Sequence, residues 1–196
     1  LCPLSPVPGA LLALGLLAYL MAEAVFRDPA RETLHRVGRV AGAWTLVAFF
    51  LGHAVLVRRH GVAPMFFLML VVMVGDSAAY FVGTALGRTR LAPRVSPNKS
   101  VEGAVGGVVV SSAAGFAACL YLKLPHGPAE GLAVAAILNV AAQAGDLAES
   151  LLKRAAGVKD SGALFPGHGG MLDRVDSFLP TLPLYAALLA LHGGAG

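Results

Sequence analysis

Long apolar stretches alternate with short polar segments along the whole chain. Each apolar stretch is about 18 to 28 residues long, and a helix of about 20 apolar residues is enough to cross a bilayer. The pattern predicts helices over residues 6–26, 40–57, 62–86, 101–122, 129–156 and 175–192. We therefore expect an all-α fold, a polytopic membrane bundle of about six transmembrane helices that forms a single domain over residues 1–196.

The composition also favours a membrane protein over a soluble one. Hydrophobic residues make up 57% of the chain, charged residues make up 13%, and the mean hydropathy is +0.73. Soluble domains usually carry about 25% charged residues. The chain begins at Leu1 rather than Met, but its first apolar stretch has no obvious cleavage site. We therefore expect that stretch to be a retained helix and not a removed signal peptide.

The placement of basic residues predicts the orientation in the membrane. Twelve of the fifteen Lys and Arg residues follow the first, third and fifth predicted helices, and three follow the second and fourth. Segments rich in Lys and Arg stay on the cytoplasmic side, so both termini should face outward. The net charge of +4 is explained by this topology and gives no indication of nucleic-acid binding.

The most polar long stretch, residues 150–176, begins on the fifth helix and ends on the sixth. Asp146, Glu149, Ser150 and Lys153 are spaced to share one helical face. Asp173 and Asp176 are three residues apart, so both can face one point. Carboxylates from two neighbouring helix ends suit a hard cation such as Mg²⁺, which predicts a metal site. The predicted metal ligands are Asp146, Asp173 and Asp176.

Purely structural roles remain as alternatives for these acids. Asp173 or Asp176 can serve as a helix N-cap, and Asp146 can pair with a nearby Lys or Arg. Asp76, the other acid within a predicted membrane helix, has Tyr80 one turn later on the same face, and a salt bridge to an Arg of another helix is an alternative role for it.

Basic groups and glycines in the same stretch suit a phosphate ligand. Gly167–Gly170 allows close approach of the backbone, and His168 within it can bind phosphate or act as an acid. Ser96 and Lys99 add a hydroxyl and an ammonium from the preceding cytoplasmic segment, 87–100, which we expect to be a loop. The predicted phosphate contacts are Lys153, Arg154, Lys159 and Arg174.

These residues form motifs that resemble a known family. Residues 150–176 read Ser-x-x-Lys-Arg-x4-Lys-Asp-x-Gly-x-x-Phe-Pro-x-His-Gly-Gly-x-x-Asp-Arg-x-Asp, which looks like the defining motif of phosphatidate cytidylyltransferases, also called CDP-diacylglycerol synthases. Residues 76–83 resemble the family's Asp-x-x-Ala-Tyr-x-x-Gly segment. Residues 96–103 resemble its Ser-Pro-Lys-Lys-Thr-x-Glu-Gly segment, with Asn98 and Ser100 as departures. The resemblance covers residues 70–177, and members are usually longer at the N-terminus.

The resemblance implies a reaction of CTP with phosphatidate that gives CDP-diacylglycerol and pyrophosphate, with Mg²⁺ and room for a second ion. It also implies a homodimer in a bacterial-type inner membrane with the active site facing the cytoplasm. The small residues of 101–122 are explained by internal helix packing, and a dimer face is the alternative. The catalytic set implied is Asp146, Lys153, Arg154, Lys159, Asp160, His168, Asp173, Arg174 and Asp176. The substrate-binding set implied is Asp76, Tyr80, Ser96, Lys99, Ser150, Gly169 and Gly170.

Three other functions remain as alternatives. A CTP-dependent polyprenol or phytol kinase would release CDP in place of pyrophosphate. An ion transporter would use Asp76 and Asp146 on its path, although the Gly/His/Asp-rich stretch argues against it. A short relative that binds without turnover is disfavoured by the intact acids.

Overall fold

The computed structural model describes residues 48–50, 52–158 and 172–193. The structure is mostly helical, with 79% of the described residues in helices. Its contacts divide the chain into two units, residues 1–52 and 53–196, and almost all described residues belong to the second. The predicted single domain stays a prediction, and the first predicted helix lies outside the described residues.

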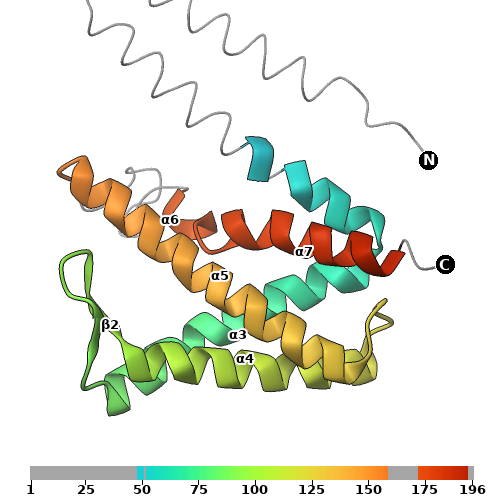
Figure 1. Cartoon of the computed structure of the whole chain (residues 1–196), viewed down its shortest axis with the longest axis horizontal. Coiled ribbons are helices and arrows are strands. Elements are labelled where there is room, and N and C mark those ends of the chain that lie inside the picture. Colours follow the sequence, from blue (N-terminus) through green and yellow to red (C-terminus); the bar gives the residue numbers. More distant parts are fainter. Residues whose placement is uncertain (1–47, 51, 159–171, 194–196) are drawn as a thin grey trace, which may run out of the picture. The chain divides into compact units, whose positions relative to one another are not determined.

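The long helices of the second unit are α3 (Val62–Leu86), α4 (Val101–Tyr121), α5 (Pro128–Ala155) and α7 (Phe178–Gly193), and residues 52–59 are helical as well. Another helix, α6 (Leu172–Val175), is a single short turn. In Figure 1, α4 packs against both α3 and α5, and α7 packs against α5. The predicted helices 62–86, 101–122 and 129–156 are confirmed to within one residue at each end.

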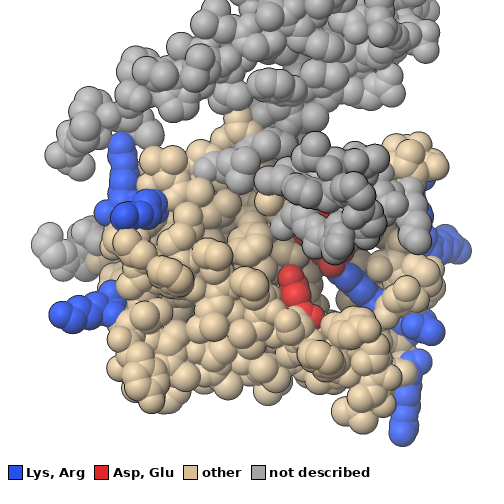
Figure 2. All heavy atoms as spheres, turned by 180° about the vertical axis from the view of Figure 1, so that it is seen from behind, with Lys and Arg blue, Asp and Glu red and all other residues tan. Residues whose placement is uncertain are grey.

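Among the described residues, α3, α4 and α5 are long and apolar enough to cross a membrane, and α7 is a shorter apolar helix. Figure 2 shows the matching charge pattern on one face, where Lys and Arg side chains project from the two ends and the band between them lacks basic groups. The described residues therefore form a membrane protein, and the total of six helices stays a prediction.

Two segments differ from the sequence-based prediction. The segment predicted as a loop contains an antiparallel ribbon of β1 (Arg90–Ala92) and β2 (Ser96–Ser100). The Glu102 carboxylate accepts the backbone N–H groups of Arg88 and Thr89 at 3.1 Å, which ties the base of the ribbon to α4.

The last helix begins at Phe178 and not at residue 175. Asp176 Oδ1 accepts a hydrogen bond from the Ser177 N–H at 2.6 Å. A local side-chain bond of this kind competes with the helical backbone bonds, which explains the break between α6 and α7.

Small residues let the helices of this unit approach closely. A Cβ added at Gly103 would lie 2.6 Å from the Ala79 carbonyl oxygen of α3. One added at Gly115 would lie 2.4 Å from Ala135 Cβ and 2.8 Å from the Gly131 carbonyl oxygen, both on α5. At these positions the internal-packing interpretation is confirmed, whereas the dimer stays a prediction.

A buried histidine, His126, lies at the end of the helix bundle opposite the ribbon. His126, between α4 and α5, is 4% exposed. Its Nε2 lies 3.1 Å from Tyr185 Oη on α7, and its Nδ1 lies 3.5 Å from Cys119 Sγ on α4. Burial lowers the pKa of His126, and nearby His192 lowers it further, while Glu130 opposes both effects.

We expect this histidine to make the protein less stable in acid. A lowered pKa means that the unfolded chain binds the proton more readily, so stability is complete above the ordinary pKa of 6.5 and falls as the pH drops below it. The slope from one such group is at most about 1.4 kcal/mol per pH unit. His126→Phe should remove this slope from thermal unfolding in detergent between about pH 8 and pH 5. His60→Phe, at an exposed position, should keep it. If His126→Phe kept the full dependence of stability on pH, His126 would not be its source.

Candidate active site

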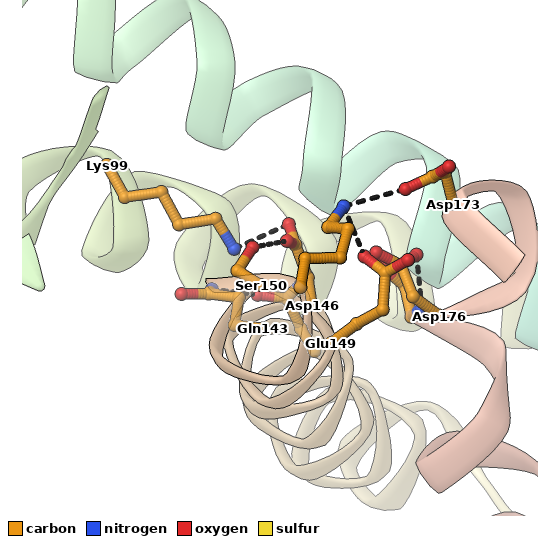
Figure 3. A network of polar contacts seen from close by, with 10 residues as sticks. Lys99, Gln143, Asp146, Glu149, Ser150, Asp173 and Asp176 are labelled. Carbon is orange, nitrogen blue, oxygen red and sulfur yellow. Dashed lines mark hydrogen bonds and ion pairs between the residues drawn. The ribbon is translucent and has the colours of Figure 1, made fainter. Parts of the chain in front are cut away.

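Carboxylates and lysines from four parts of the chain meet beside the C-terminal third of α5 (Figure 3). In Figure 2, acidic side chains lie in a hollow near one end of the molecule. The members of this acid–lysine cluster are Asp76 of α3, Lys99 of β2, Asp146, Glu149 and Lys153 of α5, Asp173 of α6, and Asp176 between α6 and α7.

The predicted shared face of α5 is confirmed. Ser150 Oγ donates to Asp146 Oδ1 at 3.4 Å, and Lys153 Nζ lies 2.7 Å from Glu149 Oε2. The other oxygen of Asp146 pairs with Lys99 Nζ at 2.5 Å. Asp146 therefore forms the ion pair that was one of its two predicted roles, and its partner is Lys99 of the ribbon.

Lys153 joins α5 to α6. Its Nζ donates to Asp173 Oδ1 at 2.7 Å while it pairs with Glu149. Glu149 is 5% exposed, and among the described residues its carboxylate has the ion pair with Lys153 but no hydrogen bond of good geometry. The sequence placed Glu149 on the correct face but not in the site. Its spacing of four residues from Lys153 was the available signal.

The deeper acids lie near one another. The electrostatic neighbours of Asp76 are Asp146, Asp176 and Lys99, with Ser177 as a hydrogen-bonding neighbour. Its cationic neighbour is thus a lysine of the ribbon, where the sequence had offered an arginine of another helix. Burial raises the pKa of Asp176, the Ser177 N–H partly offsets this, and Asp146 raises it again. Negative charge is therefore concentrated here beyond what the two lysines neutralise.

An amide pair, Gln143 and Asn139, fixes α5 beside this cluster. Gln143 Nε2 donates to Asn139 Oδ1 at 2.7 Å and to the Ala104 carbonyl of α4 at 3.1 Å. Asn139 is fully buried, and its Nδ2, which has no hydrogen-bond partner among the described residues, lies where a Cβ on Gly75 would be. These contacts hold α3, α4 and α5 together one turn before Asp146.

The remaining predicted site residues are placed less closely or not at all. Tyr80 is 67% exposed with its ring against Phe81, away from the cluster's polar contacts. Ser96 pairs with Ala92 in the ribbon, and Arg154 Nε donates to the Val95 carbonyl at 3.5 Å. Arg174 belongs to α6, but its side chain is outside the description. The predicted residues outside the described ranges are Lys159, Asp160, His168, Gly169 and Gly170.

The donor set fits a hard cation in its chemistry. Within the described ranges, no group of three or more His, Cys, Asp or Glu side chains is arranged to hold a metal. The cluster nevertheless offers only oxygen donors on its acidic side, and both oxygens of Glu149 are buried, with Lys153 Nζ 2.7 Å from Oε2. Within the described part of the chain, five carboxyl groups also lie beside two lysines, and Mg²⁺ prefers such oxygen ligands.

Lys153→Met should destabilise the protein because it leaves Glu149 buried without its ion pair. Breaking one partner of a buried pair costs about 3 kcal/mol. Unfolding in detergent measures the loss, and adding Glu149→Gln to Lys153→Met should recover much of it. Arg154→Met, which removes an exposed contact one residue away, is the control. Equal losses from Lys153→Met and Arg154→Met would contradict the bridging role.

Comparison with known proteins agrees with these motifs. The model of a family described as "Cytidylyltransferase family" matches residues 4–192. The phosphatidate cytidylyltransferase of Bacillus subtilis (strain 168) is 43% identical over 157 residues, which cover 76% of this chain and 58% of that protein. That of Brucella suis biovar 1 (strain 1330) is 48% identical over 134 residues, or 68% of this chain and 47% of that protein.

A third relative, from Staphylococcus saprophyticus, carries the same name and is 43% identical over 132 residues, or 67% of this chain and 51% of that protein. The chain thus spans about half the length of the curated relatives it matches. The family match covers nearly all of the chain and includes every residue of the acid–lysine cluster. The resemblance seen in the motifs is confirmed, and the chain belongs to the cytidylyltransferase family.

Proposed function

We propose that this chain carries the catalytic centre of a phosphatidate cytidylyltransferase, which joins CTP and phosphatidate into CDP-diacylglycerol and releases pyrophosphate. The observation that carries the proposal is the acid–lysine cluster at the end of a membrane-spanning helix. Asp146 and Lys153 of that helix meet Lys99, Asp173 and Asp176 from separate segments. The relatives named for this activity support the same assignment.

The chemistry of the cluster suits a meeting of two polyanions. The phosphate monoester of phosphatidate attacks the α-phosphorus of CTP, and the pyrophosphate leaves. A phosphate monoester is already nucleophilic near neutral pH, so the site needs no strong general base. Lys99 and Lys153 supply positive charge for the phosphates, and such fixed charges stabilise the charge that develops during transfer.

Asp146, Asp173 and Asp176 would hold Mg²⁺, with Glu149 beside them. The ion would neutralise phosphate charge and stabilise the departing pyrophosphate. Ser150 keeps the Asp146 carboxylate oriented. The proposal also includes further residues. Lys159, Asp160, His168, Arg154 and Arg174 belong to its catalytic set, and Asp76, Tyr80, Ser96, Gly169 and Gly170 belong to its substrate-binding set.

The proposed setting is a bacterial-type inner membrane crossed by about six helices, in one domain, with the site on the cytoplasmic side. CTP would reach the cluster from the cytoplasm, and phosphatidate would reach it from the leaflet. The unequal distribution of Lys and Arg between the two sides supports this orientation. We also propose a homodimer.

A single assay tests the function. The purified chain in lipid vesicles receives CTP and phosphatidate, with Mg²⁺ or with a chelator, and the products are separated. We expect CDP-diacylglycerol and pyrophosphate in equal amounts with Mg²⁺, and a loss of both with the chelator. Release of CDP would indicate a lipid kinase instead. Ion flux without CTP consumption would indicate a transporter, and either result would overturn the proposal.

A further inference from the structure

An apolar groove of about 410 Å³ lies between α4 and α5. Its walls are Val105, Val108 and Val109 of α4 together with Val140 and Ala144 of α5. Several of these side chains are exposed, including Val105 at 57%, Val109 at 62% and Val140 at 56%. Both helices are long enough to cross the membrane, so the groove opens to hydrocarbon and not to water.

The groove lies next to the acid–lysine cluster on α5. Val140, Ala144 and Leu147 form one stripe of the helix, and Asp146 lies on the adjacent stripe. Gln143 belongs to the groove lining and holds its amide against Asn139 and the Ala104 carbonyl. Gln143 precedes Asp146 by three residues, so the groove lining lies beside the cluster on α5.

The ribbon at one end of the groove carries several basic residues. Leu91 of β1 belongs to the groove lining, and Arg88, Arg90 and Arg94 on and beside the ribbon are exposed. Lys99 of β2 points from the ribbon to Asp146 (Figure 3). An apolar groove between two membrane-spanning helices, next to a ribbon rich in basic residues, is complementary to an anionic phospholipid with its phosphate at the ribbon and a chain along the helices.

We propose that this groove binds an acyl chain of the phosphatidate substrate and so selects lipids with long chains. The identity of the lipid rests on the proposed function. Sites of about 300–1,000 Å³ hold small-molecule ligands, and this groove lies within that range. A bound chain would place the phosphate beside Lys99, at the edge of the cluster where CTP reacts.

Filling the groove tests the proposal. Ala144 is exposed in the groove, and Ala144→Phe would occupy part of it. Ala133, also exposed on α5 but outside the groove lining, gives the matched control Ala133→Phe. We expect Ala144→Phe to lower kcat/KM for long-chain phosphatidate about 10-fold or more. Turnover of a water-soluble dihexanoyl phosphatidate should change much less, and Ala133→Phe should behave as the unaltered chain. Equal losses on both lipids would overturn the proposal.

A second measurement does not depend on turnover. Phosphatidate with a photoreactive diazirine in its chain is irradiated with the full-length chain in vesicles, and the labelled peptides are identified. Labelling of α4 and α5 within the groove, lost in Ala144→Phe, is expected. If labelling succeeds but no CDP-diacylglycerol forms, the proposed function fails and the groove stands. Labelling elsewhere, or cross-links across the groove between two copies of the chain, would overturn the groove assignment.

Discussion

Asp176→Asn is expected to lower turnover of CTP and phosphatidate by about 100-fold or more while the protein still folds. The carboxylate lies next to Asp146 and Asp76 in the deepest part of the cluster, where a cation is needed. An asparagine keeps the Oδ1 that accepts the Ser177 N–H, so the break between α6 and α7 can form as before. The variant thus removes a charge and keeps the local fold.

The measurement is CDP-diacylglycerol formation by the purified variant, with thermal unfolding as the check on folding. Asp173→Asn should show a similar loss of activity, with some loss of stability because Lys153 loses its partner on α6. Glu130→Gln, which alters an acid at the other end of α5, is the control and should remain active. Near wild-type turnover by Asp176→Asn would remove this residue from the reaction.

Gly115→Leu is expected to cause the largest loss of stability, about 3 kcal/mol or more. At Gly115 the nearest atoms to an added Cβ are Ala135 Cβ and the Gly131 carbonyl oxygen, at 2.4 and 2.8 Å. Neither atom belongs to the end of a flexible side chain, so α4 and α5 would have to move apart. The movement would also shift α5 and the acids on its last third.

Unfolding in detergent measures this loss. Ala117→Leu is the control because Ala117 is exposed on the same helix two residues away. Ala117→Leu should change stability little. Gly115→Leu should also lose activity, because the contact between α4 and α5 positions the acids on the last third of α5. Similar stability of the two variants would show that the α4–α5 contact is not close-packed at Gly115.

The sequence predicted the helices well because membrane crossing imposes a length and a composition. The bounds of α3, α4 and α5 follow from apolar runs that end at polar or glycine residues. The shared face of Asp146, Glu149 and Lys153 follows from helical periodicity alone. These features are local, so a single sequence contains them.

The contacts between segments could not be predicted in the same way. Lys99 meets Asp146 only because the ribbon folds back over α5, and the strands of that ribbon are too short to show an alternating pattern. Glu149 looked like an ordinary acid on a helix end until the structure showed that it is buried. The start of α7 depends on one side-chain bond to a backbone N–H, which periodicity does not record.

The length of α5 has a consequence for the lipid environment. With 28 residues, it measures about 42 Å, against about 30 Å for the hydrocarbon core of a bilayer. If α5 enters the hydrocarbon at Pro128, Asp146 lies about 27 Å along the helix, near the far edge, and Glu149 and Lys153 lie beyond that edge at the headgroup level. A thicker bilayer would draw these charged turns into an apolar medium, whereas a thinner one would leave the apolar groove partly in water. The activity of this protein should therefore depend on bilayer thickness, because the thickness sets how deep the charged turns of α5 lie.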